Sequence, residues 1–262
     1  WAGHLPAVMW IAACHESAAS QAGKVFQPNR AACGACHDNV EFATGKNHAN
    51  LPQFSDNQCS NCHNRQGELP FDLSITGAHT IPNQWSGLPG VVMNIVRVAD
   101  GVAGKRPTFQ FSLKDRAGKP ILPSAMSRLD IYLSGANADY SSRISEDVRR
   151  AEGADGNYYW TFQQPIPENA KGSYTAGIRG RIDLTILEGT TVATAARDAG
   201  TNSLLAFSVD GSPLQSRRRV VDIAKCNACH GKLTFHGDAY NQTQMCVMCH
   251  QPSFTAGTGA AA

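Results

Sequence analysis

Four copies of one pentapeptide constrain this 262-residue chain more than any other feature. Each copy has two cysteines separated by two residues and a histidine directly after the second cysteine. The copies are Cys33–His37, Cys59–His63, Cys226–His230 and Cys246–His250. This spacing lets two thiols reach the two vinyl groups on one side of a porphyrin and places the next imidazole under the ring as an iron ligand. The pattern therefore predicts four covalently attached haem c groups.

Other interpretations of paired cysteines explain less of the pattern. A structural zinc site needs four ligands and has no need of a histidine after each cysteine pair. Disulfides suit an exported chain but leave the four histidines unexplained. A thioredoxin-like redox pair needs one such motif in a βαβ setting, and the sequence shows no such setting. Covalent haem is therefore the interpretation on which the other predictions depend.

The predicted ligands follow from the motif and from a count of histidines. The thioether-forming residues are Cys33, Cys36, Cys59, Cys62, Cys226, Cys229, Cys246 and Cys249. The proximal iron ligands are His37, His63, His230 and His250. If every iron takes a second histidine and His15 is set aside, the distal ligands are His4, His48, His79 and His236. The sequence alone does not pair each distal ligand with its haem, and it predicts no catalytic residue.

The ninth cysteine, Cys14, precedes His15 in a motif that lacks its first cysteine. One thioether and His15 as proximal ligand could hold a fifth haem; otherwise this is an unlinked cysteine beside a histidine that could act as a distal ligand. Five six-coordinate haems would need ten axial ligands, and the chain has nine histidines. One iron would then take a methionine, a ligand from another chain, or an open position.

The middle of the chain, from His79 to Cys226, contains no further cysteine or histidine. Apolar residues alternate with polar ones there, in the runs around Phe111, Ile131 and Tyr158, and turn signals such as Asp210-Gly211 separate the runs. This period of two predicts an antiparallel sandwich or barrel with one buried face. The segment has no recognisable catalytic motif, so we expect it to be a spacer that fixes two haem modules.

The predicted domains are an N-terminal multihaem module over 1–87, an antiparallel β domain over 88–217 and a C-terminal dihaem module over 218–262. The C-terminal module carries two motifs in too few residues for a conventional core. We expect the porphyrins to supply the apolar mass and short helical turns to carry each motif. The fold class is therefore mixed, with haem-packed, mostly irregular or short-helix modules flanking the β domain.

Two stretches resemble the OmcA/MtrC family of multihaem cytochromes: Arg218 through Pro252, and Cys33 through His63 with the following GAHTIP. The resemblance implies split β-barrel domains between pentahaem modules, and bis-histidine haems that form a wire for extracellular electron transfer. It also implies that the distal ligands include His48, His79 and His236. Family members usually carry ten haems in a longer chain, so this chain resembles the end of one pentahaem module, a β domain and the start of the next. It could be a processed form, a fragment or a short relative.

We expect an electron carrier rather than an enzyme. The alternative is a multihaem reductase whose open iron acts on a small oxyanion or a metal ion. Expected partners are other redox proteins or an extracellular acceptor such as a metal oxide, and terminal haems could stack copies into a homo-oligomer or filament. The net charge of +2 does not suggest nucleic acid, and no apolar run is long enough to be a transmembrane segment.

The expected location follows from the chemistry, because covalent haem is attached after export. The short apolar run over 7–13 lacks a basic lead, so the chain as given shows no signal peptide. We therefore expect an exported protein, and the resemblance favours the extracellular space or the cell surface over the periplasm.

Overall fold

The computed structural model describes residues 27–251. The chain forms two compact units, which we call the front unit (Trp1–Ser86 with Lys225–Gly231) and the β unit (Gly87–Ala224 with Lys232–Ala262). The third motif therefore groups with the front unit and the fourth with the β unit, whereas the predicted three-part division stays a prediction. Three of the predicted ligands, His4, Cys14 and His15, lie outside the described residues.

Short helical turns make up the described part of the front unit. Before the β unit begins they are α3 (Arg30–Gly34), η1 (Asp56–Asn61), α4 (Ile75–Ala78) and η2 (Pro82–Gln84). The side chains of Asn29, Ser55 and Ser74 cap the first three by accepting backbone N–H groups. Within its described residues this unit buries no apolar side chain, because only Gly45, Ser74 and Gly77 are buried. The short-helix character predicted for the haem modules is confirmed.

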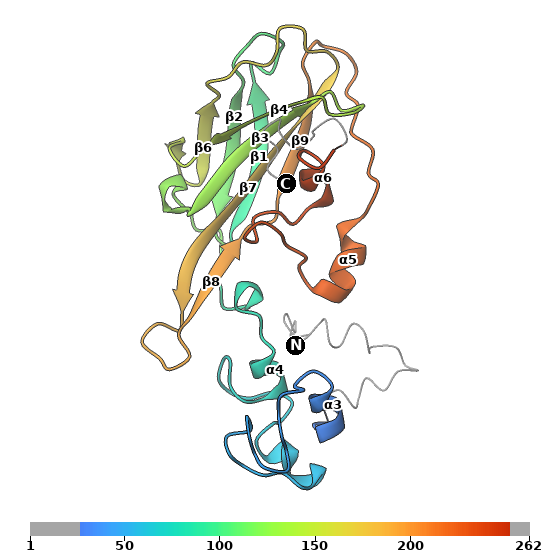
Figure 1. Cartoon of the computed structure of the whole chain (residues 1–262). Coiled ribbons are helices and arrows are strands. Elements are labelled where there is room, and N and C mark those ends of the chain that lie inside the picture. The colour runs from blue at the N-terminus through green and yellow to red at the C-terminus, as the bar shows by residue number, and fades with distance from the viewer. Residues whose placement is uncertain (1–26, 252–262) are drawn as a thin grey trace. The chain divides into compact units, whose positions relative to one another are not determined.

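Nine strands form two antiparallel sheets in the β unit (Figure 1). One sheet has the order β1-β2-β6-β5: Val92–Ala99, Thr108–Lys114, Asn157–Thr161 and Glu152–Ala154. The other has the order β4-β3-β7-β8: Ser142–Asp147, Arg128–Gly135, Ser173–Ile186 and Thr194–Ala199. The long strand β7 also pairs with β9 (Ser203–Ser208), and the turn η3 (Pro123–Ala125) precedes β3.

The inner faces of the two sheets enclose one apolar core, as the alternating pattern predicts. The central side chains are Phe109, Phe111 and Leu113 from β2 with Leu129, Ile131 and Leu133 from β3, all at most 1% exposed. The predicted antiparallel sandwich is confirmed. No helix in the described part of the chain is both long and apolar enough to cross a membrane.

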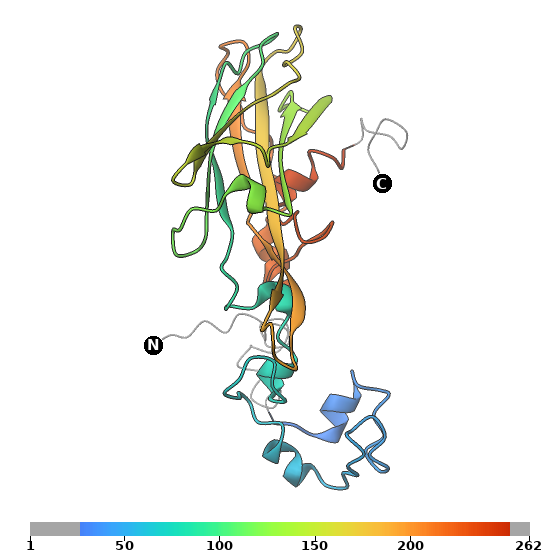
Figure 2. The same cartoon turned by 90° about the vertical axis from the view of Figure 1, so that its left-hand side faces the viewer.

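The sheet that contains β3 and β7 is buried on its outer face as well, unlike the single buried face expected. Its outward residues Tyr132 and Ser134 are 7% and 0% exposed. Tyr132 belongs to a second apolar cluster on this face, which we call the outer cluster: Tyr132, Tyr140, Ala239, Tyr240, Met245 and Met248. Figure 2 shows the C-terminal segment (red) along this side of the β unit. The outer face is therefore a docking surface for the segment that carries the fourth motif.

A glycine in β7 makes this docking close. A Cβ atom at Gly177 would lie 2.6 Å from the Met245 sulfur and 3.0 Å from the Met248 sulfur. Met245 belongs to α6 (Thr243–Cys246), and Met248 is an inner residue of the fourth motif. The remaining helix, α5 (Ile223–His230), carries the third motif.

Candidate haem-binding sites

The backbone folds into the same turn at three of the four motifs. The N–H of His37, His63 and His250 donates to the carbonyl of the first cysteine of its own motif at 2.8, 2.9 and 2.8 Å. The third motif lies in α5, which ends at His230. Such a turn brings each histidine back beside its cysteine pair, as attachment to a single porphyrin requires.

The described cysteines are Cys33, Cys36, Cys59, Cys62, Cys226, Cys246 and Cys249, and their thiols form no disulfide. Burial raises the pKa of the Cys59 and Cys246 thiols above the ordinary value. Across residues 27–251, no three His, Cys, Asp or Glu side chains converge as a metal-ion site.

Six histidines form three pairs, each joining a motif histidine to a predicted distal ligand. The ring centroids are 6.1 Å apart in His37–His79, 6.1 Å in His48–His63 and 6.0 Å in His236–His250. Two metal–nitrogen bonds of about 2 Å and two centroid-to-nitrogen distances of about 1.2 Å would place the centroids about 6.4 Å apart, close to the observed spacing. Each pair therefore fits one iron between its two imidazoles.

Backbone carbonyls orient three of these imidazoles. Nδ1 of His48 donates to the Leu51 carbonyl at 2.8 Å, that of His63 to Leu73 at 3.0 Å and that of His79 to Ile75 at 2.8 Å. A carbonyl oxygen can only accept, so Nδ1 carries the proton and Nε2 keeps its lone pair. This is the tautomer that binds iron through Nε2, and such bonds also fix the ring orientation.

The distal ligands His48 and His236 lie in related tight turns. An isolated antiparallel bridge closes each turn, Glu41–Lys46 before His48 and Phe235–Tyr240 around His236. Backbone φ is positive at Asn47 and Ala49 in the first turn, and at His236 itself in the second. Asn and Gly near a lone histidine hint at such a turn in the sequence, but they do not identify its partner.

Large apolar side chains beside these histidines are exposed. Leu73, whose carbonyl holds His63, is 70% exposed, and Phe235, next to His236, is 54% exposed. Leu51 and Phe54 near His48 are also exposed. Apolar side chains grouped around paired imidazoles suit a porphyrin face, which would cover them. The ring spacing and these side chains therefore fit a haem at His48–His63 and at His236–His250, and the ring spacing fits one at His37–His79.

The fourth proximal candidate, His230, is exposed at the end of α5. Among the described residues no second imidazole lies beside it. The pairing assigned here therefore covers three of the four motifs. The assignment of His230, and all ligand roles, stay predictions.

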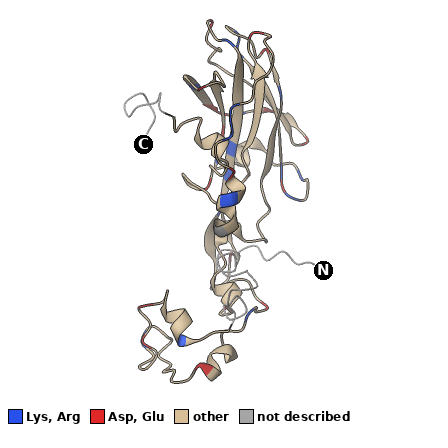
Figure 3. Ribbon diagram, turned by 90° about the vertical axis from the view of Figure 1, so that its right-hand side faces the viewer, with Lys and Arg blue, Asp and Glu red and all other residues tan. Residues whose placement is uncertain are grey.

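Charged residues of both signs are interspersed along the described chain (Figure 3). The three arginines of the run Arg217–Arg219 differ in their surroundings. Arg218 and Arg219 are exposed, whereas the guanidinium of Arg217 lies 4.6 Å from the centroid of the Tyr140 ring. Arg217 also forms an ion pair with Asp139 at 3.4 Å. One arginine of the run therefore packs on the outer cluster through Tyr140.

Cysteine–histidine motifs, imidazole pairs at an iron-spanning distance and a β-sandwich together define a multihaem c-type cytochrome. Residues 218–262 match the family model described as "Outer membrane cytochrome MtrC/MtrF-like, domains II/IV". A stretch of 99 residues is 29% identical to "Multiheme cytochrome MtrC" of Shewanella baltica, covering 37% of this chain and 15% of that protein.

Solved structures agree with these matches. The crystal structure of MtrC from Shewanella baltica aligns with a TM-score of 0.64 and 19% identity, over 93% of this chain and 47% of that one. The outer membrane decaheme cytochrome OmcA aligns with a TM-score of 0.52 and 17% identity, over 90% and 38%. The predicted resemblance is confirmed: part of the chain is similar in sequence, and most of it in fold, to OmcA/MtrC-type decahaem cytochromes. It spans less than half the length of these relatives.

Proposed function

We propose that this chain carries electrons through closely spaced haem c groups, each held by two cysteines and two histidines. The observation that carries the proposal is the 6.0–6.1 Å spacing of three imidazole pairs, each of which contains a motif histidine. Haem c, when bound, supplies an iron that cycles between ferric and ferrous states. The chain's own residues then bind the group, orient its ligands and shield its faces.

The proposed axial pairs are His37 with His79, His63 with His48, and His250 with His236. Backbone carbonyls hold three of these rings with Nε2 free to bind. Two imidazoles fill both axial positions, which suits a carrier because no position is left for a substrate. Histidine in place of methionine also keeps the potential low.

The remaining motif uses His230 as proximal ligand, with His4 as the distal candidate. Cys14 and His15 are the candidates for a fifth haem, and both lie outside the described residues. A haem at His15 would leave nine histidines for ten axial positions. The alternative function, a reductase with an open iron, would require that one axial position has no histidine.

We place the protein outside the cytoplasm, at the cell surface or beyond it. Haem attachment after export and the relationship to outer membrane cytochromes support this location. The proposed partners are other redox proteins, an extracellular acceptor such as a metal oxide, or further copies of the chain stacked through terminal haems.

Two measurements test the proposal. Intact mass under denaturing conditions counts the haems, because thioether-linked haem survives denaturation; we expect at least four. The ferric spectrum should be low-spin, and His79→Ala should convert one haem to a high-spin form without changing the haem count. Thr80→Ala, one residue away, is the matched control and should stay low-spin. A chain without haem, or a His79→Ala spectrum identical to that of the parent, would overturn the proposal.

A further inference from the structure

The three imidazole pairs differ in the angle between their ring planes. The angle is 69° for His37–His79, 37° for His48–His63 and 19° for His236–His250. In a bis-histidine haem, ring orientation decides how the ligands split the iron d orbitals. Near-parallel rings separate two of these orbitals and give a rhombic ferric EPR signal. Near-perpendicular rings leave the two almost degenerate and give one broad signal at large g. The protein controls this orientation through its axial ligands and their surroundings.

The near-parallel pair depends on a turn that is strained on its own. Backbone φ is +52° at His236, +70° at Gly237 and +68° at Asp238. Left-handed conformation is unfavourable for a residue with a side chain and persists when surrounding contacts impose it. The β unit provides such contacts: Arg181 Nη1 donates to the Gly237 carbonyl at 2.6 Å, and Arg197 pairs with Asp238 at 3.4 Å.

Two asparagines fix the end of the same turn. Asn202 N–H donates to the Asn241 side-chain oxygen at 2.9 Å, and Asn241 N–H donates to the Asn202 side-chain oxygen at 2.8 Å. The Asn202 amide also donates to the Ala239 carbonyl at 2.8 Å, and the Asn241 amide to Gly200 at 2.8 Å. Both asparagines are buried, so these bonds are shielded from water.

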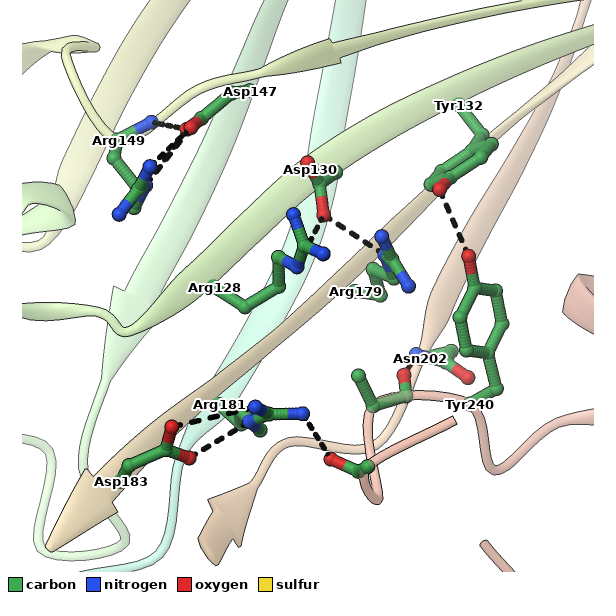
Figure 4. Close-up of polar contacts among 12 residues, drawn as sticks. Arg128, Asp130, Tyr132, Asp147, Arg149, Arg179, Arg181, Asp183, Asn202 and Tyr240 are labelled. Atoms are coloured by element: carbon green, nitrogen blue, oxygen red, sulfur yellow. Dashed lines mark hydrogen bonds and ion pairs between the residues drawn. The ribbon is translucent and has the colours of Figure 1, made fainter. Parts of the chain in front are cut away.

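Tyr240 connects this turn to the His236 ring. Its ring lies 5.3 Å from that of His236, edge to face at 74°. Its hydroxyl donates to the Tyr132 hydroxyl at 2.8 Å, and both tyrosines are buried in the outer cluster (Figure 4).

Arg179 of β7 holds both tyrosines in place. Its guanidinium lies 4.4 Å from the centroid of the Tyr240 ring and 5.2 Å from that of Tyr132. Arg179 Nε also donates to Asp130 of β3 at 2.9 Å, and the two side chains are only 10% and 11% exposed (Figure 4). A buried, paired guanidinium on two aromatic rings is a rigid support, because moving it would expose or separate the charges.

We propose that Tyr240 and Arg179 are positioning residues that hold the His236 ring nearly parallel to His250, so that the β unit sets the electronic state of the haem at the fourth motif. The inference rests on the proposed bis-histidine function and assigns the β unit a role beyond that of a spacer. In the front unit, His48 is held differently, by its own Nδ1–Leu51 bond and by Phe42, whose ring lies 5.6 Å away.

Ferric EPR of the holoprotein at liquid-helium temperature tests the proposal. The parent should show a rhombic low-spin signal. Tyr240→Leu should reduce the intensity of that signal by the contribution of one haem, and a broader signal should appear in its place. Tyr240→Phe keeps the ring and should keep most of the rhombic signal. Tyr159→Leu, at an exposed tyrosine of β6 in the other sheet, is the matched control and should leave that signal unchanged.

A second variant covers the case in which Tyr240→Leu disturbs folding. The double substitution Arg179→Met with Asp130→Asn removes the support without leaving a buried charge unpaired, and it should also reduce the rhombic signal by one haem's share. Intact mass should show an unchanged haem count in every variant. If these variants keep the parent signal, the positioning role is wrong while bis-histidine ligation stands. If the parent shows no low-spin signal at all, the proposed function itself fails.

Discussion

The front unit and the β unit place histidine pairs at the same distance by different means. In the front unit, short loops hold His48, His63 and His79 through Nδ1–carbonyl bonds, and no apolar side chain is buried among its described residues. In the β unit, His236 lies on a sheet that has its own core and a second cluster outside it. If haem binds at these pairs, we expect it to supply the missing core of the front unit, whereas in the β unit it would bind to a structure that has a core of its own.

Removing haem should have the largest effect, and only on the front unit. A chain made without haem attachment should lose ordered structure over residues 27–86, since nothing else there supplies a core. The sandwich should persist because its core is formed by its own side chains. Hydrogen exchange with limited proteolysis checks this, using the holoprotein as the control. Protection of residues 27–86 in the haem-free chain would contradict the comparison.

Filling the glycine under the fourth motif should have an intermediate effect. Gly177→Val would push Met245 and Met248 off β7, at about 1–3 kcal/mol for an overpacked site. We expect the ferric signal of the fourth-motif haem to shift while the far-UV circular dichroism of the sandwich is kept.

Gly34→Ala within the first motif is the matched control for that substitution. Its Cβ would meet Phe42 at 3.7 Å, an ordinary contact. If the ferric haem signal changes equally in the two variants, the fourth motif does not depend on its packing against β7 more than the first motif depends on its own surroundings.

The smallest effect concerns acid stability of the β unit. The Asp210 carboxylate accepts hydrogen bonds from the Ser212 hydroxyl, the Gly172 N–H and the Ser212 N–H. These bonds hold the pKa of Asp210 well below the usual range. A lowered folded-state pKa means that this stabilisation is present above the unfolded pKa of about 4 and is lost as pH falls below it. Asp210→Asn should therefore flatten the dependence of the β unit's unfolding free energy on pH below about 4. Denaturant titrations at several pH values check this, and an unchanged slope would refute it.

Strong alternation let the sequence predict most of the sandwich but not all of it. The runs around Phe111, Ile131 and Tyr158 form β2, β3 and β6 as predicted. Strands β4, β5 and β8 were not predicted, because their sequences SRISED, EGA and TAARDA are polar or short. These strands form through pairing with neighbours, which a local pattern does not contain.

The site was predictable in its residue types but not in its pairing. The motif identified the proximal histidines, and a count of histidines identified the distal candidates. Only folding brings His37 to His79 and His63 to His48. The burial of the outer face of β3 was also not predictable, because Asp130 and Ser134 look solvent-exposed in an alternating strand but are 7% and 0% exposed.

A density map of the holoprotein that resolves its porphyrins tests the central claim most directly. The account predicts one porphyrin between His37 and His79, one between His48 and His63, and one between His236 and His250. A map in which the two imidazoles of any of these pairs bind different irons, or bind none, would contradict it.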